Sequence, residues 1–458
     1  MSVPAEIFRS SSIRGLVRQT LTPQIAEKIG LAIGSEAAAR GIKRIAVGRD
    51  GRLLSADYAS AVAGGINDAG VDVIDVGLCA TPVLQFAAHE AAGGSGVMIT
   101  GGRSNAQWDG LRVMLAGVPL CGDAIAALYQ RVEAGDFAKG SGDYERESFD
   151  EAYIDKVAAD IKLARPVKLA LDCGNGATGA IAEELFRRIG ATVSVIWPQV
   201  DGNFANHFPD PTNRENLIDL VSTQRSSAQG EVGIAFSCDG AGLGVVDTRG
   251  YAIEADRVLM LLAADQVAAT PGLKVVGDVK TSPRLAGWLA ERGASIGYAP
   301  SGHGFIEAAM TADGATLGGE YSGHFYFRDR WHGHDDALYA AARIAEALSH
   351  QPDGPAAVAA LSKAFTAQEV RIKVNEGEAG PLVAEIAAKA SFDGAPEIVT
   401  TDGLRVIWPD GFGVLRASST GPALTLRFEG ASDAAYKRVQ AAFRAAIQTA
   451  RPGVALPF

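Results

Sequence analysis

Three copies of one local pattern constrain the fold of this 458-residue chain more than any other feature. Each copy is an apolar strand that ends in Asp and a small-residue turn, then a helix closed by Gly, then a second strand, as in residues 168–197. This order is typical of a βαβ unit. The turn aspartates lie about one domain length apart, so the chain predicts three related α/β domains in tandem. The aspartates are Asp50, Asp172 and Asp278, and the glycines expected at the helix ends are Gly41, Gly70, Gly190 and Gly293.

The C-terminal part of the chain follows a different pattern. TAQEVRIKVN, EIVTTDGLRVIWP, GFGVLRAS and ALTLRFEG are typical of short strands, and DAAYKRVQAAFRAAIQ is typical of a helix. This order predicts a small α+β domain. The predicted domains are 1–150, 151–252, 253–365 and 366–458.

Composition excludes several functional classes. The formal net charge is −11, which argues against a nucleic-acid partner but allows an anionic ligand in one local basic pocket. No run of eighteen apolar residues exists, and MSVPAEIFRSSSIRG lacks the apolar core of a signal peptide, so we expect neither a membrane span nor export. The cysteines have no CxxC spacing, so a reduced, cytoplasmic protein without zinc or disulfides is expected.

Four loops rich in Gly and Ser interrupt the scaffold, one in each predicted domain. They are residues 98–112, 234–247, 317–327 and 414–428. Taken singly, each loop has the composition of a tight turn. Ligands of α/β domains usually bind at such strand ends, so the four loops together predict a cleft between the domains.

The fourth loop has the chemistry of a phosphate site. Arg416, Ser418, Ser419 and Thr420 combine a guanidinium, three hydroxyls and several backbone N–H groups, which suit a dianionic phosphate. The alternative is an arginine paired with a surface acid and hydroxyls that cap the strand.

The third loop has the chemistry of a sugar site. Glu320, Ser322 and His324 alternate, so on an extended segment they would point to one side. A carboxylate beside a neutral imidazole suits the vicinal hydroxyls of a sugar. The alternative is a solvated hairpin tip.

The HGHDD segment, residues 332–336, resembles a metal site in composition. The helical ALYAAARIAEAL follows it directly, however. We therefore expect Asp335 or Asp336 to be the N-cap of that helix rather than a metal ligand.

Taken with the loops, several motifs resemble the phosphomannomutase/phosphoglucomutase group of the α-D-phosphohexomutases. They run in order along the whole chain: FRSSSIRG, GRDGRLLS, the DGNFANHFPDP…ENL stretch, DVKTS, SGHGFI, GGEYSGH and RASSTGP. The resemblance implies four domains around a central cleft, three of them α/β units with mixed sheets and the fourth an α+β domain that binds phosphate. Members of this group isomerise hexose 1-phosphates and 6-phosphates through a phosphoserine and a bound bisphosphate.

The resemblance implies that most binding positions are kept. The sugar would contact the third loop, and the phosphate the fourth. Arg112 stands where the family has Lys. The implied binding residues are Arg14, Arg103, Arg112, Lys280, His303, Glu320, Ser322, His324, Arg416, Ser418, Ser419 and Thr420.

The positions that react in the family are replaced here. Gly102 stands at the phosphoserine position and has no oxygen to phosphorylate, and Arg103 follows it. Of the three carboxylates that hold Mg²⁺ in the family, only Asp239 is kept, and Mg²⁺ needs hard anionic oxygens. Ser11 replaces a cleft Tyr, and Glu307 stands where a Lys is usual.

We therefore expect a hexose-phosphate-binding protein that has lost ordinary mutase turnover, a pseudoenzyme that binds glucose or mannose 1-phosphate, 6-phosphate or 1,6-bisphosphate. One alternative is an active mutase that uses Ser104 or a supplied bisphosphate as phosphoryl donor, and another is a non-catalytic interaction scaffold. No cofactor is expected, and Mg²⁺ only for the active alternative. We also hypothesise that Arg103 replaces part of the missing cation.

Overall fold

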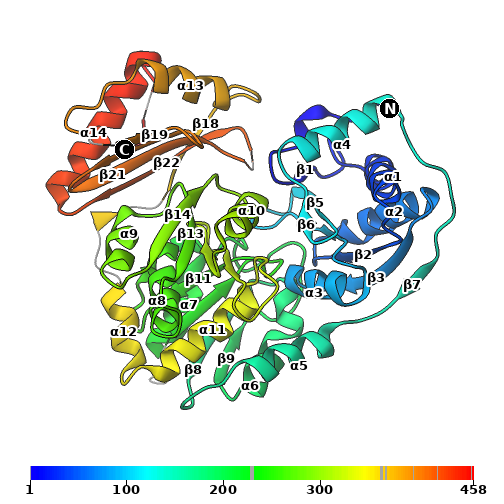
Figure 1. Ribbon diagram of the computed structural model, residues 1–458, viewed down its shortest axis with the longest axis horizontal. Coiled ribbons are helices and arrows are strands. Elements are labelled where there is room, and N and C mark those ends of the chain that lie inside the picture. The colour runs from blue at the N-terminus through cyan, green and yellow to red at the C-terminus, as the bar shows by residue number, and fades with distance from the viewer. Residues whose placement is uncertain are drawn as a thin grey trace.

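Four β-sheets follow one another along the chain, each built from consecutive strands (Figure 1). The computed structural model describes every residue except 1, 227–231, 362–364, 367–368, 396, 420 and 455. The first three sheets contain both parallel and antiparallel pairs, as the resemblance implies, and the fourth is antiparallel. The predicted domain boundaries stay a prediction.

The first sheet is mixed, with β2 parallel to both β3 and β4 and with β1 antiparallel to β5. Its strands in spatial order are β1 (Ile13–Leu16), β5 (Trp108–Leu115), β4 (Gly96–Ile99), β2 (Arg44–Arg49), β3 (Asp72–Leu78) and β7 (Tyr144–Arg146), with β6 (Val118–Pro119) beside β5. Its helices are α1 (Pro23–Ala39), α2 (Ser55–Asp68), α3 (Thr81–Ala91) and α4 (Asp123–Ala134).

The second and third sheets lie beside each other in the lower half of Figure 1. The second is ordered β12 (Ala252–Ile253), β11 (Leu243–Val246), β10 (Val232–Phe236), β8 (Lys168–Asp172) and β9 (Thr192–Ile196). The third is ordered β14 (Ser295–Ala299), β13 (Lys274–Asp278), β15 (Leu317–Gly319) and β16 (Phe325–Phe327). Their helices are α5 (Asp150–Asp160), α6 (Ala182–Arg188), α7 (Ile218–Ser226), α8 (Ala255–Val267), α9 (Pro283–Ala290), α10 (His303–Asp313), α11 (Ala337–His350) and α12 (Gly354–Leu361).

The fourth sheet confirms the strands expected near the C-terminus. Its order is β17 (Phe365–Thr366), β22 (Ala423–Gly430), β21 (Gly411–Ala417), β20 (Leu404–Trp408) and β19 (Glu397–Val399), with β18 (Val370–Lys373) also on β22. The expected helix is α14 (Asp433–Ala450), and α13 (Ala379–Lys389) is a further helix that the sequence pattern did not predict.

The repeated βαβ pattern is confirmed in all three copies. Strands β2 and β3, β8 and β9, and β13 and β14 are parallel neighbours. The three turn aspartates are fully buried, and each accepts hydrogen bonds from its own turn, such as Asp172 Oδ1 from the Gly174 N–H at 2.9 Å. The predicted helix-closing glycines all have positive φ, and three of them directly follow the cap residue.

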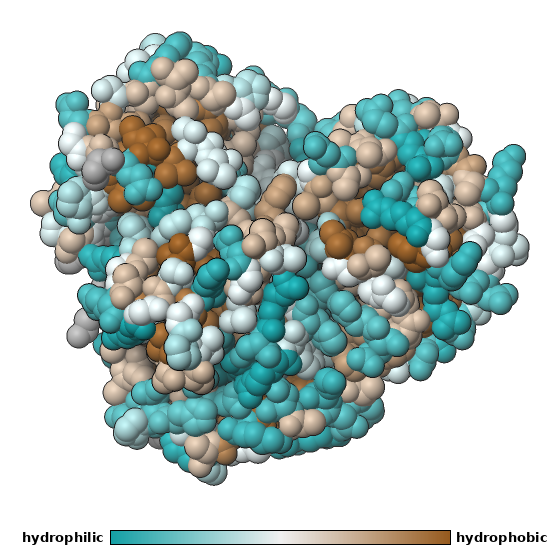
Figure 2. Space-filling model, in the orientation of Figure 1, coloured by the Kyte–Doolittle hydropathy of each residue, from teal (hydrophilic) through white to brown (hydrophobic). Residues whose placement is uncertain are grey.

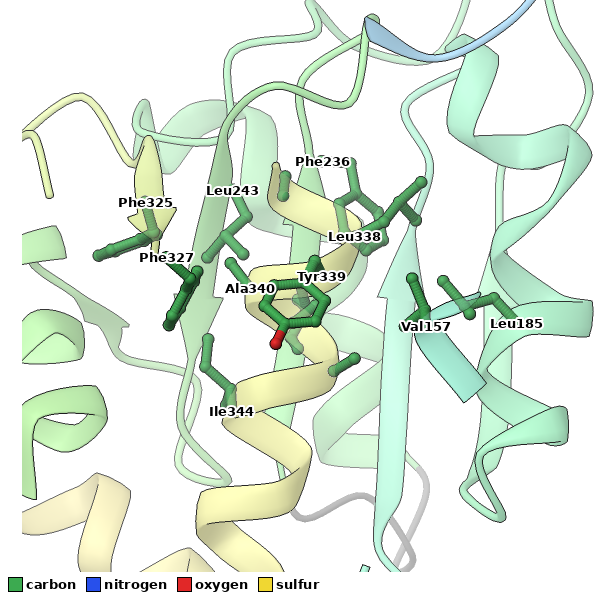
Figure 3. Close-up of a cluster of buried hydrophobic side chains, with 14 of the residues drawn as sticks. Val157, Leu185, Phe236, Leu243, Phe325, Phe327, Leu338, Tyr339, Ala340 and Ile344 are labelled. Carbon is green, nitrogen blue, oxygen red and sulfur yellow. The ribbon is translucent and has the colours of Figure 1, made fainter. Parts of the chain in front are cut away.

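Helix α11 is buried on every side between the second and third sheets. Figure 3 shows Phe236, Leu243, Phe325 and Phe327 around its residues, and Leu338 is fully buried. The helix also carries two buried charged residues, Arg343 and Glu346, and Arg343 is paired with Asp329 at 2.9 Å and lies 3.5 Å from Glu346. The side chains of the first three sheets that pack with α11 form one apolar cluster, whereas the fourth sheet and α13 and α14 have a cluster of their own.

Candidate functional site

All four Gly- and Ser-rich loops line one cavity of about 730 Å³. Figure 2 shows the surface hollowed between the lobe of the first sheet and the lobe of the fourth. A cleft of this size suits a small-molecule ligand. The predicted residues that line it are Arg14, Gly102, Arg103, Ser104, Arg112, Asp239, Lys280, His303, Glu320, Ser322, His324, Arg416, Ser418 and Ser419, whereas Thr420 lies outside the described residues.

The cleft is a local basic pocket on an acidic protein. Among the described residues that line it, seven are Arg or Lys and five are Asp or Glu, although the whole chain carries a formal charge of −11. Such a local excess of positive charge attracts anionic ligands. Arg371 and Lys373 belong to this set and were not predicted; they alternate on β18, so the strand period could have revealed them.

The third loop is a tight hairpin between β15 and β16, not the extended segment that was expected. The Glu320 N–H donates to the His324 carbonyl at 2.9 Å, and Gly323 has a φ of 84°. Nevertheless Glu320 and Ser322 are buried, so the tip is not solvated. The Glu320 carboxylate accepts from the Gly302 N–H and from the Tyr326 hydroxyl, at 2.8 and 2.6 Å, which fixes its direction.

The imidazole of the hairpin is neutral. Burial lowers the pKa of His324, despite the opposing charge of Asp335. Its Nδ1 lies 2.9 Å from the Ser322 hydroxyl. The hairpin thus offers a carboxylate, a hydroxyl and an uncharged ring, which together can donate to and accept from sugar hydroxyls.

The fourth loop carries a cation that is only partly neutralised. Arg416 Nε donates to Asp402 at 2.9 Å, which agrees in part with the alternative of an arginine paired with an acid. The side chain nevertheless lines the cleft, together with Ser418 and Ser419, and Arg371 donates to the Ser418 hydroxyl at 3.0 Å. Two guanidinium groups and two hydroxyls therefore converge where a phosphate is expected.

Two further predicted residues come from the third domain. Lys280 Nζ lies 3.1 Å from Glu369 and 3.8 Å from Asp278, so its charge is shared with acids on two elements. His303 begins α10, and burial together with the charge of Arg112 lowers its pKa well below the ordinary value. His303 is therefore a neutral group in the cleft.

The loop at 101–105 is set by a glycine in the left-handed region and by a buried cation. Gly102 has a φ of 52°, and a Cβ added to it would lie 3.2 Å from Arg14 Nη2. Arg14 is 9% exposed, and its Nη1 donates to Ser104 Oγ at 2.9 Å. Burial and the neighbouring Arg52 lower the pKa of Arg14 to about 10. A serine at position 102 would therefore be strained.

Arg52 contacts this loop through both Nη atoms of its guanidinium group; it lies in the GRDGRLLS motif, from which no such contact was predicted. Its guanidinium donates to the carbonyls of Gly102, Ser104, Asn105 and Trp108 at 2.7 to 3.0 Å. It also pairs with Asp50 at 3.1 Å. This one buried side chain therefore makes four of the hydrogen bonds that hold the loop.

Arg103 links this loop to the second domain. Its Nη1 lies 3.3 Å from Asp210 and 3.0 Å from the Thr212 hydroxyl, in the stretch that was identified as a family motif. Its charge thus has a carboxylate partner, and the hypothesis that it replaces part of a metal cation stays a prediction.

The residues at the family's metal position do not fit Mg²⁺. The Asp239 carboxylate is fully buried and accepts from the hydroxyls of Ser237 and Thr81 at 2.7 and 3.1 Å. Within the described ranges, no group of three or more His, Cys, Asp or Glu is placed to hold a metal ion. One carboxylate whose oxygens are already bonded is a weak ligand for a cation that prefers several oxygen donors.

The HGHDD segment is a capping and ion-pair element. Asp336 accepts from the Tyr339 N–H at 2.8 Å and caps α11, as expected. Its neighbour Asp335 is fully buried, and Arg112 Nη2 donates to both of its oxygens at 2.7 and 2.8 Å. Arg112 therefore enters the cleft with its charge already paired.

The two histidines of the segment meet a third from α3. His334 Nδ1 lies 2.6 Å from Glu307, and His334 Nε2 lies 2.6 Å from His89 Nε2. The His332 ring stacks on His89 with centroids 4.6 Å apart. Burial and the two neighbouring histidines lower the pKa of His89 to about 4, whereas Glu307 raises the pKa of His334.

The lowered pKa of His89 predicts a loss of stability in acid. The unfolded chain binds a proton at this residue from about pH 6.5 downward, and the folded chain binds it only near pH 4, so stability falls as the pH falls between them. Because His89 is half-buried, we expect the part of the loss due to it to be about 1 kcal/mol between pH 7 and pH 5. Urea unfolding of the wild type and of His89→Phe, which keeps the stacked ring, measures it. Equal pH slopes for the two proteins would contradict the assignment.

This α/β architecture, with sugar-type and phosphate-type side chains in one basic cleft, defines the phosphohexomutase class. The chain belongs to the phosphoglucomutase/phosphomannomutase family: residues 5–139, 151–250 and 254–365 match its alpha/beta/alpha domains I, II and III, and residues 369–446 match its C-terminal domain.

Named relatives cover nearly the whole chain. A phosphoglucomutase of Neisseria gonorrhoeae is 44% identical over 98% of both chains. A phosphomannomutase/phosphoglucomutase of Pseudomonas aeruginosa is 40% identical over 100% of this chain and 98% of its own. A crystal structure of a phosphoglucomutase/phosphomannomutase family protein from Burkholderia thailandensis superimposes with a TM-score of 0.92 at 41% identity and covers 100% of both chains.

The relatives bear on two of the sequence-based expectations. Since they are named as mutases, they do not support the expected loss of turnover, and they favour the active alternative. In the described part of the chain, no helix has the length and apolar character that crossing a bilayer requires.

Proposed function

We propose that this chain binds hexose phosphates in the four-loop cleft and interconverts hexose 1-phosphates and 6-phosphates of glucose or mannose. The observation that carries the proposal is that the sugar-type hairpin and the phosphate-type loop, from two different domains, line the same cavity. The names of the full-length relatives support turnover rather than binding alone.

In this proposal the two ends of the ligand are held by different loops. Arg416, Ser418 and Ser419 hold the phosphate that does not react, with Arg371 beside them. Glu320 accepts from the sugar hydroxyls, since its direction is fixed by Gly302 and Tyr326. Holding both ends places the other end of the sugar near the loop at 101–105.

The phosphoryl donor must differ from residue 102, because glycine has no oxygen. Ser104 lines the same cavity, and Arg14 holds its hydroxyl at 2.9 Å. A supplied hexose 1,6-bisphosphate would load it: Ser104 Oγ bonds to phosphorus, the phosphorus–sugar oxygen bond breaks, and the hydroxyl proton passes to the departing sugar oxygen. The phosphorylated Ser104 then transfers the group to the free 6-hydroxyl of a hexose 1-phosphate, whose proton passes to Ser104 Oγ. The 1,6-bisphosphate so formed gives its 1-phosphoryl group back to Ser104 by the same loading step, which leaves the hexose 6-phosphate. Arg14 would stabilise the charge on the transferring group.

We expect Ser104→Ala to slow the conversion of the hexose 1-phosphate into the 6-phosphate at least ~100-fold, because no other residue in this proposal forms the covalent intermediate. The measurement is a ³¹P NMR time course with glucose 1-phosphate or mannose 1-phosphate and a trace of the matching 1,6-bisphosphate, with and without Mg²⁺. Ser12→Ala is the matched control, since Ser12 is another hydroxyl that lines the cleft, and it should convert normally. Conversion that survives Ser104→Ala would remove Ser104 from the reaction.

A second candidate function is binding without turnover. It is favoured by Gly102 at the donor position, by its φ of 52° and by the single carboxylate at the metal position. In the same ³¹P NMR experiment, binding without turnover predicts that no 6-phosphate signal grows. The resonances of the sugar phosphate should be broadened by the wild-type protein but not by Arg416→Ala. Absence of both conversion and broadening would favour the scaffold alternative.

A further inference from the structure

Three fully buried side chains, Asp50, Ser55 and Asp109, form a line of two hydrogen-bond contacts beside the cleft. The single hydrogen of the serine hydroxyl cannot fill both contacts. Ser55 Oγ, at the start of α2, lies 3.0 Å from Asp50 Oδ1 and 2.7 Å from Asp109 Oδ2. A serine hydroxyl has one hydrogen to donate. If both carboxyls were ionised, the serine hydrogen would fill only one of the two contacts. The two oxygen atoms of the other contact would then lie at hydrogen-bond distance with no proton between them. One of the two aspartates must therefore be protonated.

The surroundings assign the proton to Asp109. Asp50 accepts from Arg52 Nε at 3.1 Å and from the Thr100 hydroxyl at 2.8 Å, so its anionic form is compensated. Of the contacts described for Asp109, the only other one is the Gly110 N–H on Oδ1, at 2.8 Å. With the proton on Asp109, its Oδ2 donates to Ser55 Oγ, and Ser55 donates to Asp50, so that both contacts hold a hydrogen.

The electrostatic surroundings of Asp109 agree with this assignment. Burial and the charge of Asp50 raise the pKa of Asp109 to about 7, although the charge of Arg52 opposes them. Tyr58 of α2 is the other titratable group that senses Asp109, and it is neutral because burial raises its pKa. The proton on Asp109 is thus held below neutral pH and released above it.

We propose that Asp109 is a positioning residue for the cleft, which acts only in its protonated form. The protonated carboxyl orients Ser55, Ser55 orients Asp50, and Asp50 orients Arg52. Arg52 in turn holds the carbonyls of Gly102 and Ser104, at 2.8 and 2.7 Å, in the loop that faces the ligand. Loss of the proton places a second anion beside Asp50 and loosens the loop.

The sign of the pH dependence follows from the raised pKa. The folded chain holds this proton up to about pH 7, and an unfolded aspartate releases it near pH 3.9, so the contribution to stability is complete in acid and lost as the pH rises through 7. Its direction is therefore opposite to that of His89.

Asp109→Asn is the decisive variant. Its amide nitrogen can donate to Ser55 as the acid proton does, its oxygen can accept from Gly110, and it cannot ionise. We expect the wild-type Kd for glucose 1-phosphate to rise about thirtyfold relative to that of Asp109→Asn between pH 6 and pH 8.5, because pH 8.5 lies about 1.5 units above the pKa of about 7 and only the protonated form holds the loop. The ratio of the two Kd values cancels the titration of the ligand. Ser55→Ala, which breaks the line, should bind like the high-pH wild type at every pH.

Two further measurements do not depend on the proposed function. The urea midpoint of the wild type should fall between pH 6 and pH 8.5 more than that of Asp109→Asn. The infrared difference spectrum of wild type minus Asp109→Asn should contain a protonated-carboxyl band at pH 6 that disappears by pH 8.5. A difference spectrum is needed because burial also raises the pKa of Asp336 to about 7, so that Asp336 gives a similar band in both proteins.

The outcomes separate this inference from the proposed function. If no variant binds glucose 1-phosphate but the band is present, the proposed function fails and the proton assignment stands. Absence of the band at pH 6, or equal pH dependence of the wild type and Asp109→Asn, would overturn the inference. If Asp109→Asn does not fold, the spectrum of Asp336→Asn, which keeps an N-cap side chain on α11, should still contain the band at pH 6 and lose it by pH 8.5, so the test survives.

Discussion

Replacing Arg52 with alanine is expected to destabilise the protein by about 3–5 kcal/mol, because the change leaves the buried Asp50 carboxylate without its cation. It also removes four hydrogen bonds from a charged donor to loop carbonyls. Urea denaturation at pH 7 measures the loss.

Arg52→Lys is the matched control. Lysine keeps the charge opposite Asp50 but has one nitrogen in place of the planar fork, so it cannot reach all four carbonyls. We expect it to recover part of the stability and little of the affinity for glucose 1-phosphate. A loss below about 1 kcal/mol for Arg52→Ala would show that the loop does not depend on this side chain.

Replacing Arg112 with alanine is expected to have a similar effect, about 3–5 kcal/mol, through Asp335. Burial alone would raise the pKa of Asp335, but the Arg112 guanidinium holds it well below its usual range. With that cation present, the aspartate stabilises the fold above about pH 4 and loses this contribution in stronger acid. Without that cation, burial raises the pKa of Asp335, so the uncompensated charge should destabilise the variant most near neutral pH, and the variant should regain part of its stability as acid neutralises the aspartate. The pH dependence of urea unfolding tests both statements.

A double variant separates the ion pair from the packing around it. Arg112→Met with Asp335→Asn removes both charges and keeps similar volumes, so we expect it to be more stable than Arg112→Ala alone. If the double variant were as unstable as the single one, the loss would come from packing rather than from the buried charge.

The sequence predicts the scaffold well because the scaffold depends on local patterns. Strand periodicity and Gly and Asp at the turns are enough to place β8, α6 and β9, and the same pattern recurs around Asp50 and Asp278. The cleft follows less directly. The resemblance names Glu320 and Arg416, but only the folded chain shows that they line one cavity.

What the sequence could not predict depends on contacts between distant segments. Arg52 binds carbonyls that lie some fifty residues away, and the proton on Asp109 is required only because Ser55 and Asp50 meet it in space. The conformation of the third loop was missed for a different reason: alternation of Glu320, Ser322 and His324 fits an extended segment, but the positive φ at Gly323 makes a turn.

The burial of α11 has a consequence for any attempt to separate the repeats. Its apolar side chains belong to the same cluster as those of the second and third sheets and of one face of the first, so removing one repeat would expose apolar side chains of its neighbours. The repeats therefore depend on one another for the burial of these side chains. The fourth unit has an apolar cluster of its own, but buried ion pairs join it to the third, Arg427 with Asp256 and Arg257 with Glu429, both at 2.9 Å.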